Sequence, residues 1–159
     1  MNLTKRLFLI LVPCTLLINS CTSIDLYEKT VSIPGHSWKN EFKPSFTFTI
    51  KDTAAVYQLF VVLRHNDKYS FNNIYINLYC QAPGQAEKKI ILDLPLATNE
   101  KGWLASGMDD IYEHRIPFVP DPAILSFKKA GDYQFWLEQI MRQDPLQNVL
   151  NAGLRIEKK

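Results

Sequence analysis

The densest run of reactive side chains in the sequence extends from Asp109 to Arg115 (DDIYEHR). On a strand, alternation would place Asp110, Tyr112 and His114 on one face. A carboxylate and an imidazole that share a face could ligate a metal or act as an acid–base pair. A metal site needs more ligands than these two, so the pattern favours a strand whose charges are solvated or paired. We therefore predict no metal, no cofactor and no catalytic residues, and we keep Asp110 and His114 as candidates for binding a ligand or partner.

Two arginines each end an apolar segment that has the pattern of a strand, Arg64 and Arg142. A guanidinium group can bind a carboxylate or phosphate through two parallel hydrogen bonds. The same group can instead close a local network, here with Asp52, Asp144 or backbone carbonyls, because polar groups at strand ends need partners. The second interpretation is favoured, and both arginines remain candidates for a ligand or partner surface.

The three tryptophans raise the possibility of sugar binding, in which rings stack on exposed aromatic side chains. Trp38 and Trp103 occur in contexts that are typical of loops and could form such a platform, whereas Trp136 lies in a dense apolar segment and is predicted to be core. A β-sandwich core also needs large aromatic residues, so this argument rests on analogy of fold alone.

Motifs that would identify an enzyme do not occur in the sequence. There is no Gly-x-Ser-x-Gly elbow, P-loop, Cys-x-x-Cys or His-Glu-x-x-His. His36 and His65 have no spacing that predicts a meeting, and the residues from His65 to Lys68 are typical of a turn. A hydrolase with two separated carboxylates stays open as an alternative.

The amino-terminal residues have the layout of a secretory signal. Lys5 and Arg6 precede an apolar run of about a dozen residues, from Leu7 to Ile18. A membrane-spanning helix needs roughly 20 apolar residues, so the layout favours a signal peptide.

The end of this segment, Leu17 to Cys21 (LINSC), resembles a lipobox. In that motif a lipid is attached to the cysteine sulfur and the peptidase cuts before the modified residue. Cys14 is a weaker candidate because Pro13 precedes it, and an ordinary signal with a coincidental cysteine is the alternative. We predict a signal peptide over residues 1–20, a lipid on Cys21, a tether over 21–27 and one domain over 28–159.

The remaining cysteine, Cys80, leaves no intramolecular disulfide possible in the mature chain. It is in step with Ile74, Ile76 and Leu78, so alternation places all four on one strand face. We interpret Cys80 as a small buried residue, because no basic or histidine neighbour suggests a reactive thiol.

Short apolar segments separated by turn signals predict an all-β fold. The expected strands are 28–33, 45–50, 57–64, 71–81, 89–96, 111–119, 133–141 and 154–157. Turns at 8–12-residue intervals are typical of a sandwich. We predict an antiparallel two-sheet β-sandwich, jelly-roll-like, with one short helix over residues 144–153, where Pro145 and Gly153 have helix-end positions. Phe60, Phe135 and Trp136 are predicted to be core.

The net charge of +2 and the lack of a long basic run exclude a nucleic-acid groove and a polybasic membrane patch. No small-molecule substrate is predicted either.

A series of motifs in chain order resembles the gliding-motility lipoprotein GldH family. These are Phe48 to Asp52, Leu63 to His65, Tyr69, Asn73 to Tyr75, Trp103-Leu104, Gly107, Asp109 to Tyr112, Gly131 to Phe135, Glu138 to Arg142, Asp144, Leu146 and Gly153 to Lys158. The resemblance implies a cell-envelope lipoprotein of Bacteroidetes-type bacteria, associated with gliding. It implies no reaction and no catalytic residues.

The function predicted from these observations is a non-catalytic interaction or structural lipoprotein of the envelope or motility apparatus. Its partners would be a membrane, through the lipid on Cys21, and envelope proteins. The alternatives are a carbohydrate-binding module and, less favoured, an envelope hydrolase. An outer-membrane position facing the periplasm is expected from the family and from Thr22-Ser23, which place no aspartate directly after Cys21.

Overall fold

The computed structural model describes residues 26–122 and 125–159. The predicted signal peptide over residues 1–20 and the lipid site at Cys21 lie outside these ranges. The first described strand begins at Leu26, within the segment that the sequence predicted as a tether. The chain from this residue onward folds into the elements that follow.

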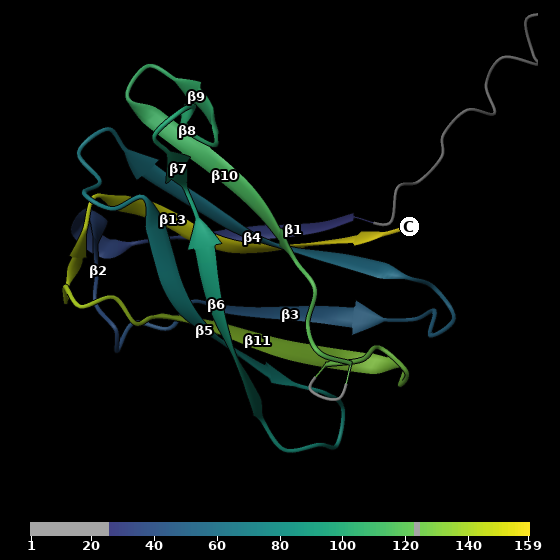
Figure 1. Cartoon of the computed structure of the whole chain (residues 1–159). Coiled ribbons are helices and arrows are strands. Elements are labelled where there is room, and N and C mark those ends of the chain that lie inside the picture. Colours follow the sequence, from purple (N-terminus) through teal and green to yellow (C-terminus); the bar gives the residue numbers. More distant parts are fainter. Residues whose placement is uncertain (1–25, 123–124) are drawn as a thin grey trace, which may run out of the picture.

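Two antiparallel sheets face each other and form the body of the molecule (Figure 1). The main strands are β1 (Leu26–Ser32), β3 (Ser45–Ile50), β4 (Tyr57–Asn66), β5 (Asn73–Gln81), β6 (Lys88–Pro95), β10 (Ile111–Phe118), β11 (Gly131–Gln139) and β13 (Val149–Lys158). The shorter elements are the 3₁₀ helix η2 (Pro34–His36), β2 (Ser37–Trp38), β7 (Ala97–Thr98), β8 (Gly102–Trp103), β9 (Ser106–Met108) and β12 (Leu146–Gln147). One sheet has the order β1-β13-β4-β10-β9, and the other has the order β3-β11-β5-β6.

The pairing of the eight main strands is that of a jelly roll. The first pairs with the last (β1 with β13), the second with the seventh (β3 with β11), the third with the sixth (β4 with β10), and the fourth with the fifth (β5 with β6). This order results when one long antiparallel ribbon folds over into two facing sheets. The predicted all-β, two-sheet sandwich is confirmed.

Alternation of side chains explains why these segments form a sandwich. Along β3, Phe46 and Ile50 are buried between the sheets, while Thr47 and Thr49 face outward and are exposed. Along β5, the predicted apolar face that ends at Cys80 is buried. Burial raises the pKa of the Cys80 thiol, which fits a packing role.

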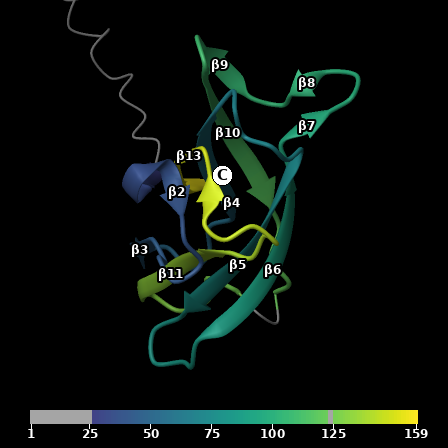
Figure 2. The same cartoon turned by 90° about the vertical axis from the view of Figure 1, so that its left-hand side faces the viewer.

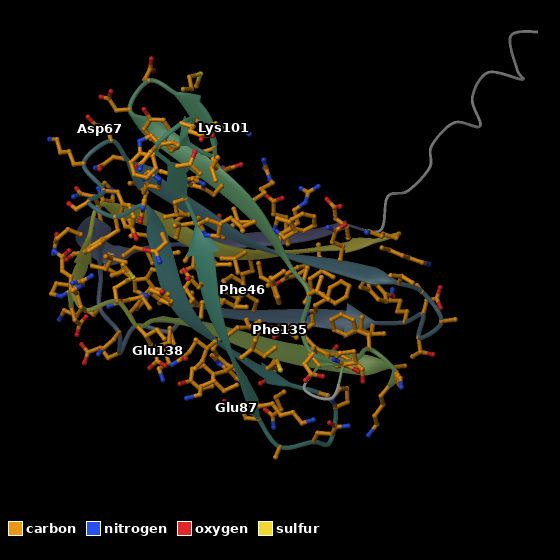
Figure 3. The ribbon with its side chains drawn as sticks, viewed as in Figure 1. Phe46, Asp67, Glu87, Lys101, Phe135 and Glu138 are labelled. Atoms are coloured by element: carbon orange, nitrogen blue, oxygen red, sulfur yellow. The ribbon has the colours of Figure 1, made fainter. Side chains whose placement is uncertain are left out.

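The core lies between the two sheets, where Phe135 and its register partner Phe46 are buried (Figure 3). Two residues that the sequence placed in the core are instead half-buried on outer faces, Phe60 and Trp136. The correction follows from alternation, because the neighbours Leu59 and Val61 take the inward positions on β4. A dense apolar run does not reveal which of its faces is covered.

The predicted helix over residues 144–153 is wrong. Leu146 and Gln147 form β12, which pairs with β2, and β13 begins at Val149. Gly153 does not end a helix but lies in β13, where an added Cβ would come 2.7 Å from the Lys29 carbonyl oxygen of β1. Proline, asparagine and glycine at these spacings also suit turns and close strand packing, and sheet pairing decides between the two outcomes.

The sandwich has two distinct ends. At one end, which we call the base, Leu26 pairs with Glu157 near the carboxyl terminus. At the other, which we call the distal end, β4 ends at Asn66, one residue after His65. The ten residues of β4 span roughly 30 Å between the two ends. Figures 1 and 2 show β7, β8 and β9 projecting from the distal end, away from the carboxyl terminus.

Candidate functional site

The projecting segment, residues 97–110, carries β7, β8 and β9, and we call it the arm. The amide groups of Leu96 and Ala97 both donate to the Asn72 carbonyl, at 2.8 and 2.9 Å, where the arm begins. Where it ends, the Asp67 amide donates to the Asp110 carbonyl at 3.0 Å. Figure 3 shows Asp67 and Lys101 at this end of the molecule. The arm is thus attached at both of its ends.

A cluster of rings fixes the arm to the sandwich. Trp103 of β8 contacts His65 edge-on, with 4.4 Å between ring centroids. His65 also lies against Tyr69, Tyr112 and His114, at centroid separations of 4.9, 5.5 and 5.0 Å. We call these five residues the ring cluster. His65 is at its centre, so the position of the arm depends on this side chain.

The two histidines of the ring cluster form a direct hydrogen bond. Their Nε2 atoms are 2.9 Å apart, and both side chains are fully buried. Nδ1 of His65 is 2.7 Å from the Asn66 carbonyl, which can only accept, so this nitrogen carries a proton. In the neutral pair His114 therefore donates from Nε2, and its buried Nδ1 has no hydrogen bond of good geometry within the described residues.

The environment of the pair keeps both imidazoles uncharged. Burial lowers the pKa of His65. Burial, together with repulsion from His65, lowers the pKa of His114 to about 4, and the Leu104 backbone offsets only part of the fall. In residues 26–122 and 125–159 no group of three potential metal ligands occurs. The arrangement is suited to fixing the arm, because neither imidazole is open to a substrate in solvent.

The outward side of the arm and of the adjoining strand exposes apolar side chains. Leu104 and Ile111 are about half exposed, and Met108 is 80% exposed. Beside them is a shallow hollow of about 400 Å³, bordered by Ser106, Glu113 and other residues of β10 and the arm. An exposed apolar patch next to charged groups is typical of a surface that binds another protein.

Charged side chains connect the hollow to the outer face of the sheet. These side chains alternate in sign and come from β4, β10, β1 and β13 in turn. In order they are Arg64, Glu113, Arg115, Glu28, Arg155 and Glu157, and we call them the charge ladder. The Arg115–Glu113 and Arg115–Glu28 contacts are 2.7 and 3.3 Å long. Each carboxylate of the ladder thus has a cationic neighbour within the fold.

Three of the residues that the sequence suggested as a ligand or partner surface lie in the ring cluster or the charge ladder, and a fourth lies in an exposed turn. Arg64 forms an ion pair with Glu113, and its predicted partners Asp52 and Asp144 are engaged elsewhere. His114 and Trp103 meet in the ring cluster. Asp110 is exposed in the turn before β10 and does not share a strand face with His114.

The other two candidates do not join this group. Trp38 is fully buried, and its Nε1 donates to the Phe42 carbonyl at 2.8 Å. It therefore cannot form a sugar platform with Trp103, which corrects that prediction. Arg142 is exposed in the loop after β11, and within the part of the chain that the structure describes it has no ion pair.

His65 is the functional residue that the sequence argument missed. Its neighbours Asn66, Asp67 and Lys68 are typical of a turn, and the turn does follow, but β4 includes His65 and continues to Asn66. Alternation along the strand could have revealed that His65 is buried, because it is in step with the inward residues Val61 and Leu63. Its meeting with His114 depends on the pairing of β4 with β10, which no local pattern reveals.

No helix within residues 26–122 and 125–159 has the length and apolar character needed to cross a bilayer. The model of the GldH lipoprotein family matches residues 25–156 of the chain. A gliding motility lipoprotein GldH from Flavobacterium johnsoniae is 27% identical over 157 residues, with 94% of this chain and 95% of that protein covered. A GldH homolog from Christiangramia forsetii is 25% identical over 150 residues, with 90% of each chain covered. A structure of infectious bursal disease virus strain Gx overlaps 87% of this chain and 33% of its own, at 12% identity and a TM-score of 0.33, which is too low to carry an argument.

Proposed function

Because the chain belongs to the GldH lipoprotein family, we propose that it is a membrane-tethered, non-catalytic interaction component of the cell envelope that serves gliding motility. The lipid would be attached to Cys21, and the domain would stand on the periplasmic side of the outer membrane. The arm would bind an envelope protein. Both named relatives are gliding motility lipoproteins, which supports the lipid anchor and the motility role.

The observation that carries this proposal is the apolar surface of the arm at the distal end. Burying Met108, Leu104 and Ile111 in an interface would be favourable, at about 25 cal/mol for each Å² of apolar surface. Leu26 begins β1 at the base, so an anchor at Cys21 would point the arm away from the membrane by roughly the length of a strand. The exposed side chains of the arm are thus where a second protein can reach them.

The alternatives receive less support from the same surfaces. A sugar-binding module would present two or three exposed coplanar rings, but Trp38 is buried and Trp103 is half-buried with its ring against His65. A hydrolase would present two carboxylates beside a cleft. Glu113 and Glu28 border the outer face, but both are paired with arginines.

The test is crosslinking in living cells of a gliding species, with an affinity tag after Lys159 at the base. Met108→Asp places a charge in the arm's apolar surface, and Val119→Asp, at a residue that is 93% exposed near the base, is the matched control. We expect the Met108 variant to lose specific crosslinked envelope proteins and gliding speed, while the Val119 variant keeps both. Equal crosslinking and motility in the two variants, at equal protein levels, would contradict the role of the arm.

A further inference from the structure

The strand β3 is an edge strand without the features that usually protect an edge. Charged side chains or proline at an edge discourage another strand from pairing there. The edge β1 carries Glu28 and Lys29, β6 begins with Lys88-Lys89 and ends at Pro95, and β10 beyond the end of β9 carries Arg115 and Pro117. By contrast, β3 reads Ser-Phe-Thr-Phe-Thr-Ile and has neither a charge nor a proline.

The backbone of β3 has one side directed to β11 and the other directed away from the sheet. The Pro44 carbonyl accepts from the Leu137 amide at 3.1 Å, so residue 44 faces β11. Backbone direction alternates along a strand, and the even-numbered residues of β3 therefore face β11. The amide and carbonyl groups of Ser45, Thr47 and Thr49 are directed to the open edge, where the described residues add no further strand to the sheet.

A pocket of about 370 Å³ lies along this edge, between β3 and the start of β1. Its walls include the aromatic rings of Tyr27, Phe48 and Tyr57 and the side chain of Lys51. The Tyr27 hydroxyl is buried, which raises the pKa of Tyr27, and it lies against the Thr47 backbone, which lowers that pKa by less than burial raises it. Buried hydroxyl groups normally have a partner, and within residues 26–122 and 125–159 this one has no hydrogen bond of good geometry.

We propose that the open edge of β3 is a binding site for an extended segment of another envelope protein, which pairs antiparallel with Ser45–Ile50. The segment would satisfy the outward backbone groups of β3, insert one apolar side chain into the pocket beside Tyr27, and place a carboxylate next to Lys51. Strand addition of this kind takes its affinity from main-chain hydrogen bonds and its specificity from pockets for alternate side chains.

The charge at the site favours an acidic residue in the partner. Lys51 follows β3 directly and is exposed, and it has no ion pair in residues 26–122 and 125–159. Its neighbour Asp52 is already engaged by Lys158 at 3.0 Å. In antiparallel pairing the amino-terminal end of the incoming segment meets the carboxyl-terminal end of β3, so the acidic residue belongs at the start of that segment.

A second copy of the chain fits this edge less well than a different protein. Antiparallel pairing of β3 with itself requires a two-fold axis perpendicular to the sheet, which reverses the strand direction in the second copy. The two Leu26 residues would then lie at opposite ends of the pair. Five residues from Cys21 to Leu26 reach at most roughly 18 Å, so two upright copies could not share one membrane surface.

This inference rests on the proposed role in protein interactions but not on the arm, because the β3 edge lies elsewhere on the molecule. The pocket is lined by residues near the base, Tyr27 and Tyr57 among them. A partner bound there would lie close to the membrane, whereas a partner of the arm would lie roughly a strand length farther out. The two surfaces can therefore be tested separately.

The experiment uses the full mature lipoprotein in detergent micelles and the peptide Asp-Val-Thr-Phe-Thr-Val-Thr as the probe. Amide hydrogen exchange is followed residue by residue. We expect the peptide to slow exchange at the Thr47 and Thr49 amides at least tenfold and to leave Phe46 and Phe48 unchanged. The control peptide has its aspartate moved to the carboxyl end and should bind about three- to tenfold more weakly.

Two variants test separately the backbone pairing and the charge contact of the peptide. Thr47→Pro removes an outward amide that β11 does not use, and it should abolish peptide binding. Lys51→Glu changes an exposed residue outside the core, so the domain should stay folded, and it should weaken binding of the aspartate-first peptide about three- to tenfold. A lysine-first peptide should reverse that preference, while the control Lys101→Glu should bind as the unchanged chain does.

The remaining outcomes decide against the proposal. Exchange that slows at β6 or nowhere would overturn it, and so would full binding to Thr47→Pro. Protection of Thr47 without peptide that rises with protein concentration would assign the edge to a second copy. The Met108→Asp variant should bind the peptide normally, so failure of the arm hypothesis and failure of this one give different results.

Discussion

The core between the sheets and the attachment of the arm are built from different kinds of side chain. Phe46, Phe135 and their neighbours in the core are apolar and fully enclosed by two layers of strands. The arm is fixed by one tryptophan that lies on a buried pair of histidines. The core gains from the area that it buries, whereas the arm depends on a few ring contacts and on imidazoles that stay neutral.

Because of this difference, the arm can open while the sandwich stays folded. Segments with few buried apolar contacts open at a lower free energy than the global unfolding of the domain. Most residues of the arm are exposed, and between its two ends Trp103 is the large side chain that packs against the core. A surface that binds a partner can use such freedom, because its own rearrangement does not endanger the fold.

The largest effect should come from the core. Phe135→Ala removes a fully buried ring and should lower the free energy of unfolding by about 3–5 kcal/mol. Trp136→Ala, at the next residue but on the half-buried outer face, should cost only about 1–2 kcal/mol. Denaturant unfolding followed by circular dichroism measures both values. Equal losses would show that the inner and outer faces of β11 are not as different as alternation implies.

The second effect is a loss of stability in mild acid. The pKa of His114 is about 4 in the folded chain and about 6.5 when unfolded. The unfolded chain therefore binds the proton first, and stability is full above pH 6.5 and falls as the pH drops from 6.5 toward 4. The total loss is roughly 3 kcal/mol. His114→Gln should reduce the slope in this window and leave the part that comes from His65, whose pKa burial also lowers.

A second acid-sensitive group falls in a separate pH window. Burial alone would raise the pKa of Glu138, but hydrogen bonds from Asn77, Lys43 and Tyr79 outweigh it and hold the pKa at about 2. Stability from this carboxylate is present above its unfolded pKa of about 4.3 and is lost as the pH falls toward 2. A stability profile whose slope begins only below pH 4.5 would therefore assign acid sensitivity to Glu138 and contradict the histidine argument.

The sequence predicts the main strands and some of their buried faces, but it does not predict the features that depend on which strands pair. Period-two alternation places the strand over residues 45–50 correctly and identifies Cys80 as buried, because a strand's own residues carry that information. The pattern over 144–153 fits both a helix and a turn, and only the pairing of β12 with β2 decides. The ring cluster was out of reach because His65 and His114 are 49 residues apart and meet through strand register.

The third effect is local to the arm. Trp103→Ala removes the ring that contacts His65, and it should lower global stability by about 1–2 kcal/mol. Because the arm is then no longer fixed, trypsin should cleave after the exposed Lys101 much faster than in the unchanged chain. Tyr75→Ala, at an exposed ring on the other sheet, is the control. Slow cleavage at Lys101 in the Trp103 variant would mean that the hydrogen bonds at the two ends of the arm are sufficient to hold it.

The smallest effect should come from the charge ladder. Glu28→Gln removes the carboxylate that joins Arg115 to Arg155. Ion pairs near a surface contribute about 0–1 kcal/mol each, and salt screens them. The loss should therefore stay below about 1 kcal/mol in low salt and shrink further in 1 M salt, in contrast to Phe135→Ala, whose apolar burial salt does not weaken. A larger, salt-independent loss would mean that the ladder acts through buried hydrogen bonds, and that the outer face of this sheet carries part of the stability here assigned to the core.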